Sequence, residues 1–262
     1  MSTWASDNKL YMSWGDGCGP GAAISGKICQ PAVSFTDAGI ASFQGPLPNI
    51  QCQNPADCVI FRHVPSGKPP VPIGGTDRDD KPSSLLYYNN VLYWAGHTPA
   101  GNPNFEYIAY SNDNGRTWNE VPNSPWTKNS NSNFRAMMFI QMGKNYELNT
   151  DGFVYALAIG KEFDWTGGTY LARVPKNSIA DYSAYEYYSS ADENPSWSDS
   201  QSDAKPLNNI LAQGIGSAIY HSGIERYIFL SIIAKDNPKG AYFTLFESPA
   251  PWGPWQKVSE IQ

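Results

Sequence analysis

Short polar turns alternate along this chain with runs of aliphatic and aromatic residues. Each polar dipeptide or glycine turn stands between two β-rich runs, which is the pattern of a tight β-hairpin. A further aromatic run follows each of the later hairpins, as in residues 105–111, 168–174 and 240–248. The hairpins themselves cover residues 6–14, 88–96, 150–158 and 221–230.

Hairpins that recur in larger units predict an all-β fold in which each unit is one blade of a β-propeller. We place the units up to about residue 64 and over residues 82–121, 134–188 and 214–258. The first is the least regular, and no fifth unit is marked. Polar connections that are rich in proline or serine, at residues 65–81 and 189–213, are expected to be loops that carry specificity.

Composition agrees with one aromatic, strand-rich domain over residues 1–262. Aromatic residues make up 14% of the chain, and charged residues make up 16% against roughly 25% in an average domain. With 23 glycines and 21 prolines the chain turns often, which excludes a helical bundle, a coiled coil and a disordered tail.

Charge and hydropathy argue against two classes of partner, nucleic acids and membranes. The net charge is −6, and no cluster of Lys and Arg could neutralise a row of phosphates, so we expect no nucleic-acid partner. No apolar run approaches 18 residues, so no membrane span is expected. The first ten residues lack the regions of a signal peptide and read as the middle of a strand. We therefore expect natural residues to precede Met1, and we expect a monomer.

All four cysteines, Cys18, Cys29, Cys52 and Cys58, lie in the first quarter of the chain. Four cysteines allow three pairings, of which neighbours in sequence are the simplest. A zinc site is the alternative, but there is no CxxC and His63 is the only histidine nearby. We predict two disulfides, hence an oxidising, extracellular location.

Residues 111–118 read S-x-D-x-G-x-T-W and resemble the Asp-box of sialidase-like propellers. The aspartate and asparagine are expected to accept backbone hydrogen bonds and Gly115 to take a positive φ. Trp118 is expected to be a buried anchor of the turn that packs between sheets. Asp113 is therefore expected to be structural. A comparable turn, with Trp255 as its buried anchor, ends the last unit.

Longer phrases resemble one family. They read TWASDNKLYMSWGDG, KPSSLLYYNNVLYW and FIQMGKNYELNTDGFVYALAI, followed by YLARVPKNSIADYSAYEYY and GIGSAIYHSGIERYIFL. Together they are similar to a secreted propeller family catalogued as a domain of unknown function, which includes bacterial endo-D-arabinanases. The resemblance implies a five-bladed propeller, related in architecture to arabinanases and β-xylosidases, that hydrolyses a polysaccharide.

The chain departs from that family at two places. The family has an acidic residue a few positions before the opening tryptophan, and that position would precede Met1 here. Near the end, the family has Tyr-Asn where this chain has Tyr220-His221.

Glycoside hydrolysis needs two carboxyl groups, an acid at the leaving oxygen and a base or nucleophile opposite it. Asp16, between glycines in the family phrase WGDG, is our first candidate for a catalytic residue. Asp80, before the second unit, and Glu162, after the second strand of the third unit, are the other two. Asp164 is a reserve candidate, and Asp79 and Asp151 are expected to be solvated or structural.

Further side chains fall at the same expected mouth of the propeller. Lys81 would bind a sugar hydroxyl or keep a carboxylate ionised. His97 ends a second strand, although a surface histidine is the commoner outcome. Trp94 and Trp165 offer further faces for stacking, although most tryptophans should be core. We expect Arg173 and Glu186 to form an outer salt bridge. The predicted substrate contacts are Trp14, Lys81, His97, Asn133, Arg135 and Tyr146.

Three alternatives to a secreted, endo-arabinanase-like hydrolase stay open or are disfavoured on the residues. A propeller could bind polysaccharide or oligosaccharide without cleaving it, and a lyase could use His97 or His221 as its base. A sialidase would need three arginines for its substrate's carboxylate, and this chain has few. No cofactor is predicted, while a structural calcium on the propeller axis stays open.

Overall fold

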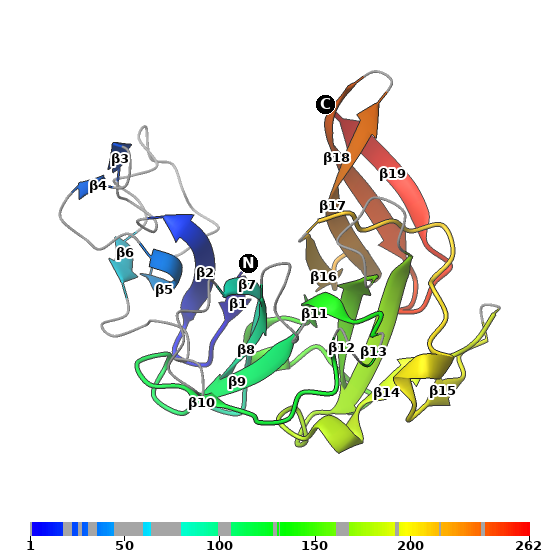
Figure 1. The fold of residues 1–262 in the computed structure, drawn as a ribbon, viewed down its shortest axis with the longest axis horizontal. Helices are drawn as coiled ribbons and strands as arrows, with labels where there is room; N and C mark the ends of the chain where they lie inside the picture. Colours follow the sequence, from blue (N-terminus) through cyan, green and yellow to red (C-terminus); the bar gives the residue numbers. More distant parts are fainter. Residues whose placement is uncertain are drawn as a thin grey trace.

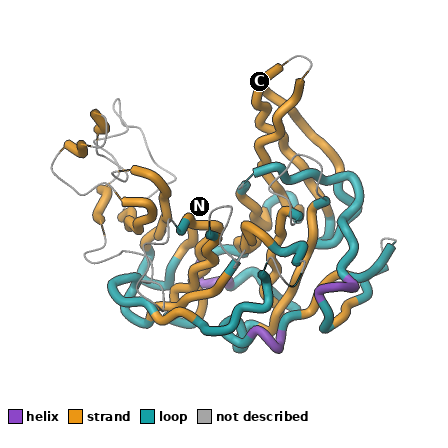
Figure 2. Tube along the Cα trace, in the orientation of Figure 1, coloured by secondary structure: helices purple, strands orange, loops and turns teal. Residues whose placement is uncertain are grey.

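The fold is all-β in the computed structural model (Figure 1). Strands dominate the trace in Figure 2, and the helices described are short 3-10 turns, η3 (Lys144–Tyr146), η4 (Tyr182–Ala184) and η5 (Gln201–Asp203). Among the described residues, no helix is long and apolar enough to cross a membrane. The structure describes residues 2–17, 23–25, 28–30, 36–44, 60–63, 80–98, 106–127, 130, 132–160, 168–191, 194–214, 216–236 and 239–262.

The first two sheets match the first two predicted units. The first has the order β1-β2-β5-β6, with a separate β3-β4 pair, and the second has the order β10-β9-β8-β7. The strands of the first are β1 (Ser2–Trp4), β2 (Lys9–Gly17), β5 (Thr36–Gln44) and β6 (Ile60–His63), and the separate pair is β3 (Ala23–Ser25) and β4 (Ile28–Gln30). Those of the second are β7 (Lys81–Tyr88), β8 (Val91–His97), β9 (Tyr107–Ser111) and β10 (Asn119–Glu120).

The last two predicted units are antiparallel sheets joined by a parallel contact between β11 and β16, where Ile140 is opposite Ala218. The third unit gains a short fifth strand, β15, beyond its predicted end. Its strands are β11 (Arg135–Gln141), β12 (Phe153–Ile159), β13 (Thr169–Pro175), β14 (Glu186–Tyr188) and β15 (Trp197–Ser198). The fourth contains β16 (Ser217–His221), β17 (Arg226–Asp236), β18 (Lys239–Ser248) and β19 (Gln256–Ile261).

The first strand of each sheet lies toward the middle of the molecule (Figure 1). β1 packs against β7, β7 against β11, and β11 against β16. A small pocket, about 190 Å³ with its open mouth included, is lined by Ser2, Ser84, Gln141 and Ser217 from these four strands, together with neighbouring residues. This is the arrangement predicted for blades. Among the described strands β1 and β16 do not pair, so ring closure and a fifth blade stay predictions.

Two of the four repeated hairpins share a hydrogen bond between an aspartate in the turn and the tyrosine four residues later. Asp7 accepts hydrogen bonds from the Lys9 backbone N–H (3.1 Å) and the Tyr11 hydroxyl (3.0 Å). Asp151 does the same with the Phe153 N–H (3.0 Å) and the Tyr155 hydroxyl (2.6 Å). An Asx-turn bond of this kind fixes the turn. Asp151 therefore has the structural role predicted for it.

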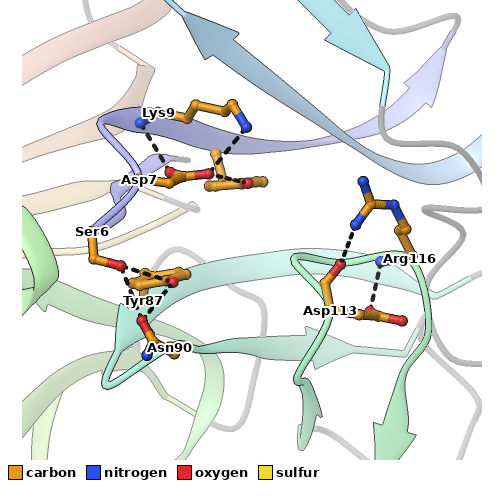
Figure 3. A network of polar contacts seen from close by, with 8 residues as sticks. Ser6, Asp7, Lys9, Tyr87, Asn90, Asp113 and Arg116 are labelled. Carbon is orange, nitrogen blue, oxygen red and sulfur yellow. Dashed lines mark hydrogen bonds and ion pairs between the residues drawn. The ribbon is translucent and has the colours of Figure 1, made fainter.

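The first two sheets are linked by polar contacts beside the turn that contains Asp7 (Figure 3). The Ser6 and Tyr87 hydroxyls lie 3.1 Å apart, and Ser6 also donates to Asn90 Oδ1 at 3.1 Å. Thr3 Oγ1 accepts the backbone N–H of Tyr87 at 2.9 Å. Because Tyr11 and Tyr87 also stack, with centroids 6.3 Å apart, this edge combines apolar contact with satisfied polar groups.

The turn at residues 111–118 is held by Asp113, whose carboxylate accepts from the Arg116 N–H group (Figure 3). It also accepts from the N–H group and the hydroxyl of Thr117. These bonds lower the pKa of Asp113 to about 2. Gly115 has φ +85°, as predicted. Trp255 is buried, as predicted. Trp118 is only half-buried: its ring packs edge-on against Trp94, with centroids 5.9 Å apart, and keeps some contact with solvent.

The two faces of the last sheet differ, which gives a prediction along one strand, β18. Phe246 is 4% exposed and packs in the core, whereas Phe243, on the opposite face, is 53% exposed. Phe243→Ala should therefore lower the free energy of unfolding by less than about 1 kcal/mol, as surface changes do. Urea denaturation should show a much larger loss for Phe246→Ala. Equal losses would mean that the Phe243 face is buried in solution.

Candidate functional site

Four titratable side chains are buried together where β7 and β11 begin, β8 ends and the chain enters β9. They are Asp80, His97, Glu106 and Arg135, with exposed fractions of 4%, 6%, 0% and 7%. The register places Lys81 opposite His97, and β11 lies beside β7. Burying charge costs free energy unless partners compensate it, so such a cluster marks a site rather than ordinary core.

A serine hydroxyl connects two members of the cluster. Ser83 Oγ, on β7, lies 2.9 Å from Nδ1 of His97 and 3.1 Å from Oε2 of Glu106. Ser83 is fully buried, as is Glu106. The three side chains therefore form a continuous hydrogen-bonded row from β7 to the ends of β8 and β9.

Asp80 is held from β9, two strands away from β7 in the sheet, because the Tyr107 hydroxyl donates to its Oδ2 at 3.1 Å. Tyr107 lies opposite Gly96, and the missing side chain of Gly96 makes room for the ring. A Cβ atom there would lie 2.8 Å from Tyr107 and 2.2 Å from Trp94. Gly96 thus allows the close approach that orients Tyr107 toward Asp80.

The backbone of β11 is distorted next to Arg135. Ala136 has φ +51°, and the pairing with β12 shifts between Arg135 and Met138, as at a β-bulge. The bulge turns the N–H groups of Ala136 and Met137 toward Glu106. Burial raises the pKa of Glu106 well above 4.5, while Ser83, these N–H groups and Arg135 oppose the rise. Such backbone strain is typical of functional sites.

His97 is kept neutral by its surroundings. Burial, with the positive charges of Arg135 and Lys81, lowers its pKa from 6.5 to about 4. At neutral pH the ring can donate one hydrogen bond and accept another, as binding of a sugar hydroxyl requires.

This shift predicts how stability depends on pH. Between pH 6.5 and 4 the unfolded chain binds a proton at His97 that the folded chain does not, so stability falls as pH falls. His97→Gln should remove this dependence. The free energy of unfolding of the wild type, relative to the variant, should fall by about 3 kcal/mol at most from pH 7 to pH 4. Urea denaturation of both proteins at each pH measures the difference, which cancels the titration of groups that are not linked to His97. A constant difference would show that His97 titrates normally.

Of the predicted site residues, Asp80, His97 and Arg135 lie in this cluster, with Lys81 at its edge. Asn133 stands two residues before β11 and is partly exposed. The expectation of a surface position for His97 was wrong, because only 6% of the residue is exposed. The predicted outer salt bridge is confirmed, with Arg173 Nε 2.6 Å from Glu186 Oε2.

Two aromatic predictions are wrong. Tyr146 follows the far end of β11 from Arg135 and is 2% exposed, since its hydroxyl accepts the Tyr155 N–H inside the core. Trp94 is fully buried and offers no stacking face. Trp14 is half-buried with its ring against Gly39, where a Cβ atom would lie 2.2 Å away.

Several predictions fall outside the described residues. Asp16 belongs to β2 and Cys29 to β4, but neither side chain is described. Their roles and the disulfides remain predictions. Among the described side chains, no group of three His, Cys, Asp or Glu could hold a metal ion. Also outside are Cys18, Cys52, Cys58, Asp79, Glu162, Asp164 and Trp165.

Ser83, Glu106 and Tyr107 were not predicted from the sequence. Ser83 lies inside an apolar strand, and Glu106 stands beside an aromatic run that reads as core. One observation pointed to Glu106. It is a charged residue at the start of an apolar run, and that run follows the one that ends at His97.

The chain is similar in fold to one solved structure and more weakly similar to two others. A protein of Bacteroides ovatus ATCC 8483, described as a candidate hydrolase, superimposes with a TM-score of 0.52 at 15% identity, over 99% of this chain and 68% of that chain. An alpha-L-arabinofuranosidase of Clostridium thermocellum ATCC 27405 gives 0.49 at 13%, over 98% and 72%. The arabinanase of Bacillus subtilis gives 0.45 at 11%, over 94% and 70%.

Sequence comparisons place the chain in a family. No curated protein matches it. The family model described as "Domain of unknown function (DUF4185)" matches residues 83–262, which is well over half of the chain and includes Ser83, His97, Glu106 and Arg135. The chain therefore belongs to the DUF4185 family.

Proposed function

We propose that this protein is a glycoside hydrolase that cleaves a polysaccharide internally, in the manner of an endo-arabinanase. The observation that carries the proposal is the buried cluster of Asp80, His97, Glu106 and Arg135 beside the first strands of two adjacent sheets. Glycosidases need carboxyl groups whose ionisation is set by burial and neighbouring charges, and this cluster supplies that environment.

The residues divide by role. Of the two carboxyl groups that hydrolysis requires, Asp80 is the one that lies in the cluster. The Tyr107 hydroxyl donates to one of its oxygens at 3.1 Å. Asp16 and Glu162 remain the candidates for its partner, which a second carboxyl group must provide. Arg135, Lys81 and the neutral ring of His97 supply donors and acceptors for sugar hydroxyls.

The choice of substrate rests on the phrases that resemble the endo-D-arabinanases, such as WGDG at residues 14–17. We further propose that the protein is secreted, with its four cysteines paired within the first predicted unit. Mass mapping of oxidised protein tests the pairing, and four free thiols would refute it.

The test of function is incubation with arabinan, xylan, pectin and uronate polymers. We expect new reducing ends from arabinan, distributed over products of several lengths, and no absorbance from unsaturated sugars. Unsaturated products would instead indicate a lyase. Retarded migration in an arabinan-containing gel without new reducing ends would indicate a binding protein. Either of these outcomes would overturn the hydrolase proposal.

A further inference from the structure

A single hydroxyl group stands between Glu106 and His97. Ser83 Oγ is 3.1 Å from Glu106 Oε2 and 2.9 Å from His97 Nδ1, and Ser83 and Glu106 have no exposed surface. A serine hydroxyl carries one proton, so it can donate to only one of these neighbours and must accept from the other.

Two proton arrangements satisfy both bonds without leaving an unpaired buried O–H, because among the described residues Glu106 Oε1 has no hydrogen-bond partner that could accept a proton carried on that oxygen. If Glu106 is ionised, Ser83 donates to its carboxylate and accepts from Nδ1–H of His97. If Glu106 is protonated, its carboxyl group donates to Ser83, and Ser83 donates to a bare Nδ1. The neutral ring then carries its proton on Nε2, because a neutral imidazole has one N–H.

We propose that Glu106 is a positioning residue that sets, through the Ser83 hydroxyl, which ring nitrogen of His97 carries the proton. The proton state of a fully buried carboxyl group is thereby transmitted to the ring that ends β8. Nε2, the nitrogen that Ser83 does not contact, is an acceptor in one state and a donor in the other.

Charged and titratable groups on three neighbouring elements affect the protonation of Glu106 and His97. Arg135 on β11 faces both Glu106 and His97, and Lys81 on β7 faces His97. Tyr182 and Tyr185, near η4, act on Glu106 through space, since the electrostatic effects are mutual. Because the pKa of His97 is about 4, its ring stays neutral above pH 5 and its tautomer is defined there.

If the proposed hydrolase function holds, this row decides whether His97 offers a donor or an acceptor to a sugar hydroxyl. The link between Glu106 and the ring does not depend on that function. It is open to a test without any substrate.

The test is NMR of protein labelled with ¹⁵N in histidine and ¹³C in glutamate, between pH 5 and 9. The chain has three histidines, so His63→Gln and His221→Gln identify the His97 signals, and Glu106→Gln identifies the Glu106 carboxyl signal. We expect the proton on Nε2 wherever Glu106 gives the shift of an acid, and on Nδ1 wherever it gives that of a carboxylate.

Ser83→Ala should break this correspondence, leaving the tautomer independent of Glu106. Ser231→Ala is the matched control, because it also removes a fully buried hydroxyl from a strand, β17, and should change nothing at His97. The opposite pairing in wild-type protein, or the same pairing in Ser83→Ala, would overturn the proposal. Should Ser83→Ala fail to fold, the wild-type pairing alone decides.

Discussion

Trp126→Ala should lower the free energy of unfolding by about 3–5 kcal/mol, the range of large aromatic truncations in a core. Trp126 is fully buried between the second and third sheets, where its ring meets Tyr182 and Tyr185 edge-on at 5.2 and 5.0 Å. Its Nε1 donates to the Tyr187 hydroxyl at 3.0 Å. The truncation therefore leaves a cavity and a buried hydroxyl without its donor.

The measurement is urea denaturation followed by circular dichroism, with Trp4→Ala as the matched control. Trp4 is 48% exposed on β1, so its loss should cost far less. Trp126→Phe combined with Tyr187→Phe forms a double-mutant cycle that isolates the hydrogen bond, expected to contribute about 1 kcal/mol. Equal costs at Trp126 and Trp4 would show that Trp126 does not join the two sheets.

The units were predictable because hairpin turns depend on neighbouring residues. Asp7 and Asp151 each bind the backbone two residues on and the tyrosine four residues on, so local sequence carries the repeat. Trp126 was not identified as an anchor because its partners, at residues 182–187, are distant in the chain. The position of Tyr146 was missed for the same reason, since η3, in which it lies, packs against the distant strands β1 and β7.

The site was predictable only in part. Asp80, His97 and Arg135 could be expected because each stands at a strand end that the fold directs toward one edge. Ser83 and Glu106 could not, since nothing local distinguishes a serine in a hydrogen-bonded row from one that fills a gap. The strain at Ala136 also depends on a bulge that the sequence does not mark.

Asp80→Asn should reduce the rate of polysaccharide cleavage by about 10²–10⁴-fold, the contribution of one positioned acid or base. The asparagine keeps an oxygen that can accept the Tyr107 hydroxyl, so the fold should survive. What it loses is the negative charge and the ability to exchange a proton. The loss should therefore appear in kcat more than in KM.

Two variants separate this role from a structural one. Asp151→Asn makes the same chemical change far from the cluster and should leave the rate within a factor of about two. Asp151 lies in the turn before β12, whereas Arg135 pairs with Ile159 at the opposite end of that strand. Tyr107→Phe removes the bond to Asp80 while the carboxylate stays, and should cost about 10–100-fold, as expected for a hydrogen bond to a charged group. If Asp80→Asn kept more than a tenth of the wild-type rate with an unchanged melting temperature, Asp80 would be a binding residue at most. Asp16 and Glu162 would then have to supply both carboxyl groups that the hydrolysis requires.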